Sequence, residues 1–246
     1  MEEYERDRKT KGGSVFPVTR WTLVDAAASS KNESKEALGT FCQSYWYPLY
    51  AFARRSGFSA PDAEDLTQGF FMRLLEKSWL SDADRTKGKL RTFLLIAFRR
   101  FQTNEWRHGM ALQRGGGKVM VMSDLEGVED RYAGAQPGLT AEELFDRQWA
   151  LALLGNVLES LEKEFSDNGK QKDYDVLKGV LMADHGELNY AELAETLETS
   201  EGSARVAAHR LRKKFRQRFR HAIEETLEEG ESLSEEMAFL AKVLSE

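Results

Sequence analysis

Apolar residues recur three or four positions apart in three segments of the N-terminal half, which is the spacing of an amphipathic helix. The repeating residues are Phe41, Tyr45, Leu49 and Phe52, then Ala63, Leu66, Phe70 and Leu74, then Leu90, Leu94, Ala97 and Phe101. Ser59 precedes the second segment as an N-cap, and Gly57 and Gly88 mark nearby turns. These segments predict a bundle of three helices.

The C-terminal half returns to the same period after a glycine-rich stretch that has no sustained helical repeat. Thr140 and Glu143 form a capping box before a long helix, and Asn189 and Glu192 repeat the device before a short one. The helical repeats are Leu151, Leu154, Leu158, Leu161 and Phe165, then Tyr174, Leu177 and Leu181, then Ala194 and Leu197. No alternating run of convincing length predicts a strand. The pattern predicts an all-α fold of two small helical bundles joined by a flexible linker.

A chain of 246 residues is long enough for two such domains. The predicted segments are an N-terminal extension (1–35), a first bundle (36–108), a linker (109–139), a second bundle (140–222) and an acidic C-terminal tail (223–246).

Composition narrows the class of protein. One cysteine excludes a disulfide framework, and four scattered histidines leave no zinc cluster of the usual two-pair spacing. No run approaches the roughly 18 apolar residues of a membrane span, and the first residues lack the apolar core of a signal peptide. We therefore expect a cytoplasmic protein with no metal, no cofactor and no membrane contact.

The net charge of -6 conceals two cationic segments. Residues 85–107 hold seven basic residues and one acid, and residues 205–221 hold eight basic residues and no acid. The segment 124–167 and the tail 222–246 are strongly acidic. Two basic islands on amphipathic helices favour binding to a polyanion over a merely solvated surface.

The second basic island lies in a helix-turn-helix pattern, with a short helix over 190–197, a turn over 198–200 and a basic helix from 201 to about 219. The N-terminal end of the basic helix would enter a major groove of DNA. Base edges would meet Ser203, Arg205 and His209, and phosphates would be held by Arg210, Lys213, Arg216 and the helix N-terminus. A helical hairpin of no special purpose explains the turn but not the basic residues.

The first basic island mixes aromatic and basic residues, a combination that binds unpaired bases. These residues are Phe93, Phe98, Phe101 and Trp106 beside Arg91, Arg99, Arg100 and Arg107. Taken alone, this helix is better explained by a core of aromatic residues with solubilising arginines outside. The preceding helix carries an apolar and polar mixture at Gln68, Phe71 and Arg73 that could dock a protein.

Three blocks in a fixed order carry a family resemblance. SAPDAEDLTQGFFMRLLEK, GKLRTFLLIAFRRFQTNEWRH and YAELAETLETSEGSARVAAHRLRKKFRQRF resemble the sequence of an extracytoplasmic-function (ECF) sigma factor of RNA polymerase. TRWTLVDAA and YWYPLYAFARR further suggest the bacterial subgroup with an extended N-terminus. The likeness covers most of residues 19–227. The first two blocks resemble the sigma-2 domain and the third resembles the sigma-4 helix-turn-helix.

The resemblance implies a role for each block. The first would bind the clamp of the large polymerase subunit through Asp62, Asp65, Leu66, Gln68, Phe71 and Arg73. The second would recognise and melt the -10 element through Lys89, Arg91, Arg99, Arg100, Asn104 and Arg107. The third would read the -35 element through Ser200, Glu201, Gly202, Ser203, Arg205, Val206, His209, Arg210 and Lys213. One departure is Glu198, where the family's turn usually carries glycine.

The resemblance predicts a sigma factor and not an enzyme. Its implied partners are core RNA polymerase and promoter DNA, as duplex and as melted single strand. An anti-sigma protein or other regulator is left open. The alternative is a helix-turn-helix transcriptional regulator that works without polymerase, which leaves the first bundle unexplained. A pure protein-interaction module leaves the basic helix unexplained. No nucleophile and base occur at a recognisable catalytic spacing, and residues 115–118 lack the remainder of a phosphate-binding loop.

The acidic tail after Ala222 motivates a separate hypothesis: it folds back on a basic face and keeps the free factor off DNA. The competing interpretation is a plain amphipathic surface helix with Leu233, Met237, Leu240 and Leu244 facing inward.

Overall fold

The computed structural model describes residues 33–76, 89–107, 127–133, 137–183, 188–227 and 230–245. Its elements are α2 (Glu33–Arg55), α3 (Ala60–Glu76), α4 (Leu90–Arg107), α5 (Val128–Ala133), α6 (Ala141–Asp167), α7 (Gln171–Leu177), the 3-10 helix η2 (Lys178–Leu181), α8 (Tyr190–Thr196), α9 (Glu201–Glu224) and α10 (Leu233–Ser245). Every element in the described ranges is helical, so the predicted all-α fold is confirmed there. Most of the predicted N-terminal extension and residues 108–126 of the linker region lie outside these ranges.

The predicted helix starts are confirmed by their capping hydrogen bonds. The Glu143 amide donates to Thr140 Oγ1 at 3.2 Å, and the Thr140 amide donates to Glu143 Oε2 at 2.8 Å. Asn189 caps α8 and Ser200 caps α9, each through a side-chain oxygen that accepts a hydrogen bond from a backbone amide of the first helical turn. Each cap satisfies a backbone donor that the helix itself leaves without a partner.

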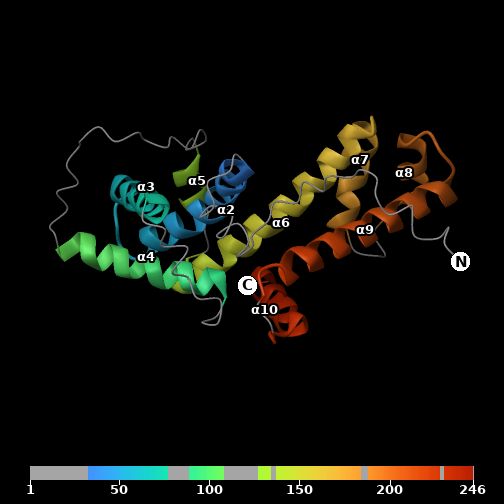
Figure 1. Ribbon diagram of the computed structural model, residues 1–246. Coiled ribbons are helices and arrows are strands. Elements are labelled where there is room, and N and C mark those ends of the chain that lie inside the picture. Colours follow the sequence, from blue (N-terminus) through green and yellow to red (C-terminus); the bar gives the residue numbers. More distant parts are fainter. Residues whose placement is uncertain are drawn as a thin grey trace, which may run out of the picture.

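Helix α6 runs from the part of the molecule that holds α2, α3 and α4 to the part that holds α7 (Figure 1), and it contributes to two apolar clusters among the described residues. Its N-terminal half packs on α2, and Phe145 and Trp149 are buried in the first cluster with residues of α3 and α4. Its C-terminal half supplies Val157 and Leu161 to the second cluster, which also draws on α7, η2 and α9. The division of the chain into two domains stays a prediction, because one helix is shared by the two clusters.

Helix α5 lies inside the stretch that the sequence predicts as a linker, so that stretch is not wholly irregular. Glu129 accepts a hydrogen bond from Arg54 Nε at 3.1 Å, and the Arg131 guanidinium lies 3.7 Å from the centre of the Tyr47 ring. The helix has six residues and none is buried. A helix of less than two turns is too short to show an apolar period in the sequence. Contacts with α2, and not an apolar stripe of its own, hold α5 in place.

The C-terminal segment is ordered into α10, which packs against α6 and α9. Leu240 is buried as expected, but Met237 is 38% exposed and Glu236, at 1% exposed, takes the inward position instead. The predicted inward stripe is therefore wrong at Met237. Among the described helices, none combines the length and the apolar content needed to cross a membrane.

Candidate nucleic-acid interface

Helices α8 and α9, joined by a short turn, lie where the sequence predicts the two helices of a helix-turn-helix. Ala194 of α8 and Ala204 and Ala208 of α9 are buried, so small side chains allow the two helices to approach each other. Glu198 in the turn has a φ of 51°, and it is the one non-glycine residue in the left-handed region among the described residues. The turn therefore keeps the left-handed conformation that glycine would adopt without strain.

The residues predicted to read the -35 element come together on the outer side of α9 and its N-cap. All of them are exposed: Ser200, Glu201, Gly202, Ser203, Arg205, Val206, His209, Arg210 and Lys213. Arg205, His209 and Lys213 follow each other at four-residue spacing, which keeps them on one side of a helix. Val206 adds an apolar side chain that is 49% exposed. This face of α9 therefore presents hydrogen-bond donors and one apolar side chain.

Two local contacts hold Arg205 near the helix N-terminus. Its Nη2 donates to Glu201 Oε1 at 2.6 Å, and its guanidinium lies 4.7 Å from the centre of the Tyr190 ring. An ion pair between exposed side chains contributes at most about 1 kcal/mol. Arg205 can therefore exchange Glu201 for a phosphate or a base edge at little cost.

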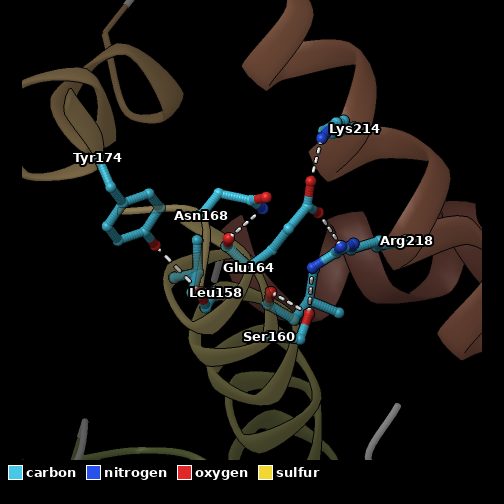
Figure 2. A network of polar contacts seen from close by, with 8 residues as sticks. Leu158, Ser160, Glu164, Asn168, Tyr174, Lys214 and Arg218 are labelled. Atoms are coloured by element: carbon cyan, nitrogen blue, oxygen red, sulfur yellow. Dashed lines mark hydrogen bonds and ion pairs between the residues drawn. The ribbon is translucent and has the colours of Figure 1, made fainter. Parts of the chain in front are cut away.

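Three basic residues of α9 contact neighbouring elements: Arg212 and Arg218 are partly buried, and Lys214 is exposed. The Arg212 guanidinium donates to the carbonyl oxygens of Val180 at 3.1 Å and Ala183 at 2.7 Å. Lys214 and Arg218 form ion pairs with Glu164 of α6, which Figure 2 shows reaching between them. From the sequence alone, all basic residues of this helix were treated as one group. The residues that pair within the fold could not be separated from the others until the neighbouring helix was known.

The residues predicted for the -10 element occupy different environments along α4. Arg99, Arg100 and Asn104 are exposed, and Arg99 forms an ion pair with Glu142 of α6. Lys89 and Arg91 are both engaged by α10. The side chain of Arg107 lies outside the described residues. In this conformation the predicted set does not form one open surface.

Arg91 is the centre of a buried cluster of charged and aromatic side chains. It is 7% exposed, and its guanidinium lies 4.6 Å from the Trp149 ring centre and 4.9 Å from the Phe239 ring centre. Its Nε is 3.3 Å from Asp146, and its Nη1 forms an ion pair with Glu236. Both rings therefore cover a cation whose charge is matched by carboxylates.

The two carboxylates of this cluster differ in acidity. Burial opposes ionisation of Glu236, but hydrogen bonds from Arg91 and Lys89 outweigh it and lower the pKa of Glu236 below its ordinary value. Burial raises the pKa of Asp146, and the nearby Arg91 charge offsets only part of this effect. Glu236 is thus the carboxylate that the cluster stabilises most in its charged form.

Sequence reasoning missed Glu236, although its position carried a signal. It lies three residues after Leu233 and four before Leu240, so an acid interrupts the apolar stripe of α10. A charged residue at such a position needs a partner when the helix docks. The partner could not be identified from the sequence, because Arg91 is 145 positions away.

The residues predicted to bind polymerase are divided between surface and core. Asp65 and Arg73 are exposed, and Asp62 and Gln68 are partly exposed. Leu66 and Phe71 are 1% and 2% exposed and pack within the first apolar cluster. In this conformation α3 presents its polar residues, and not those two apolar ones, to a partner.

The described ranges contain no group of three His, Cys, Asp or Glu side chains that could hold a metal ion. The chain matches no family model, no curated protein and no solved structure. The likeness to sigma factors therefore rests on the residues and motifs of this chain.

Replacing Arg91 by methionine tests the buried cluster. The Arg91→Met change leaves the buried Glu236 and the partly buried Asp146 without the guanidinium, so we expect the free energy of unfolding to fall by about 3 kcal/mol in urea titrations. Arg100→Met, on the exposed side of the same helix, is the control and should change it by about 0.5 kcal/mol or less. Equal losses for the two variants would contradict the cluster.

The turn conformation gives a second prediction. Glu198→Gly removes the side chain from a left-handed residue and should raise the free energy of unfolding by about 1 kcal/mol. Glu198→Val should lower it, because a branched side chain fits this region worst. Urea titration of the three proteins is the measurement. Valine and glycine variants of equal stability would exclude the left-handed turn.

Proposed function

We propose that the chain is a sigma factor of the ECF type, which directs core RNA polymerase to promoters and helps to melt them. The observation that carries the proposal is the outer face of α9, where every residue predicted to read the -35 element is exposed on a helix backed by α8. Basic side chains at the start of a helix, with a short helix packed behind it, are the geometry that reads a major groove.

Charge supports the same function. Arg205, Arg210 and Lys213 are exposed, whereas Arg212 and Arg218 are partly buried in contacts with residues outside α9, and the exposed Lys214 pairs with Glu164. The internal contacts fix the helix while the outer cations are left for phosphates. Arg99 and Arg100 on α4 offer a second, separate cationic site for a melted strand.

Two contacts on one chain act together in this mechanism. Binding of α9 to the -35 element raises the effective concentration of α4 at the -10 element, so two weak contacts give a specific complex. Polymerase carries out the chemistry, and the chain supplies promoter choice and capture of the separated strand. A protein with this function works in the cytoplasm and needs no metal or cofactor of its own.

A helix-turn-helix regulator that acts without polymerase is the second candidate function. The burial of Leu66 and Phe71 favours it, because these two predicted polymerase contacts are inside the first apolar cluster. The two functions share α9 and differ at α3. The residue that separates them best is therefore Asp65, which is exposed.

Charge reversal on α3 tests the polymerase contact. Wild-type chain should co-elute with bacterial core RNA polymerase on gel filtration, and Asp65→Arg should abolish the complex by reversing a charge in the contact. Glu159→Arg, an equal reversal on the exposed side of α6, is the control and should co-elute. If the wild type does not bind core while it still binds duplex DNA, the regulator is the correct function.

Charge reversal on α9 tests DNA reading. Arg205→Glu should weaken binding to a duplex taken from upstream of the chain's own gene by about tenfold or more at low salt. Lys172→Glu on α7 makes the same change of charge at an exposed residue away from the helix-turn-helix and should have little effect. Fluorescence anisotropy against salt concentration measures both. Equal weakening by the two variants would mean that overall charge, and not the α9 face, binds DNA.

A further inference from the structure

Helix α10 is attached to the rest of the chain by an apolar stripe and by one buried acid. Leu240 is buried against the first cluster, and Arg147 Nη1 donates to the carbonyl oxygen of Val243 at 2.7 Å. Glu236 is 1% exposed, whereas its neighbour Glu235 is exposed. The docked helix therefore buries one selected carboxylate.

The two oxygens of that carboxylate are bound by Arg91 of α4 and by Lys89, the residue just before α4. Glu236 Oε1 pairs with Arg91 Nη1, and Glu236 Oε2 pairs with Lys89 Nζ. A phosphate of a nucleic-acid backbone also presents two charged oxygens to basic side chains. The carboxylate thus occupies the place on α4 that a phosphate needs.

A buried ion pair is a poor way to fasten a helix. Removing two charges from water offsets much of their attraction, and apolar residues of similar size often stabilise a fold equally well. What the ion pair adds is sensitivity to competing charge, because an anion that binds Lys89 and Arg91 displaces Glu236. The Phe239 ring, which covers Arg91 from α10, would leave with it.

We propose that α10 is an intramolecular competitor of nucleic acid, in which Glu236 occupies Lys89 and Arg91 in the free chain and leaves them when the backbone of a DNA strand binds there. This inference rests on the proposed function, because it takes α4 to be a DNA-binding helix. It assigns to the C-terminal segment a role in keeping the free chain from binding DNA.

A static clasp is the competing interpretation. In that case Glu236 only fixes α4, α6 and α10 together, and the DNA affinity of the chain does not depend on whether the pair is intact. The two interpretations make opposite predictions for a variant that weakens α10 without touching α4.

The test compares Glu236→Gln with Glu235→Gln in the full chain. Both changes remove one negative charge from neighbouring positions of α10, and only the first removes the partner of Lys89 and Arg91. The probe is a fluorescein-labelled single-stranded oligonucleotide, and binding is followed by anisotropy at low salt. We expect Glu236→Gln to bind about tenfold tighter than wild type, because the fraction of chains with an open site rises. Glu235→Gln should stay within about twofold of wild type.

Hydrogen exchange on the wild type gives a readout that does not depend on how the variant folds. The amides of 233–245 should lose protection when the oligonucleotide binds, since α10 leaves α4. Equal affinities of the two variants for the oligonucleotide, or unchanged protection of the amides of 233–245 in the bound wild type, would overturn the proposal that α10 competes with nucleic acid. Either result would leave the proposed function intact. If neither the wild type nor the variants bind the oligonucleotide, with or without core polymerase, the proposed function fails and this inference fails with it.

Discussion

The buried guanidinium of Arg91 connects three helices that are far apart in the sequence. It lies between Trp149 of α6 and Phe239 of α10, and its charge is met by Asp146 and Glu236. A buried cation must be paired, so this one residue of α4 constrains where α6 and α10 can lie. Because α6 continues into the second apolar cluster, this contact and the packing of α6 on α2 together set where α8 and α9 lie relative to α4.

A second carboxylate, that of Glu164, pairs with two cations of α9. Glu164 pairs with the exposed Lys214 and the partly buried Arg218 and so holds α9 to α6, while Arg205 and Lys213 remain on the outside. At both sites one acid pairs with two cations from a distant segment of the chain. The acidic and basic segments of this chain are therefore partners in the fold, and the cations left over define the surface that DNA is proposed to contact.

Local features of the fold could be predicted from the sequence, and long-range ones could not. The caps at Thr140, Asn189 and Ser200 are set by residues three positions apart, so the sequence contains the whole interaction. Contacts such as Glu236 with Arg91 span 145 positions, and nothing local distinguishes a cation that will be buried from one that will be exposed. The acidity of the tail suggested that it folds back on a basic face, but not that Glu236 is the residue that meets Lys89 and Arg91.

As a sigma factor, this chain is proposed to give core polymerase a choice of promoter. To measure this directly, the chain is added to bacterial core RNA polymerase together with fragments of the genome that encodes it, and the 5′ ends of the transcripts are mapped. We expect transcripts, absent with core alone, that start downstream of two short motifs held at one spacing, because α9 and α4 belong to one chain. A transcript pattern identical to that of core alone, from a chain that still binds duplex DNA in a salt-dependent way, would contradict the sigma function.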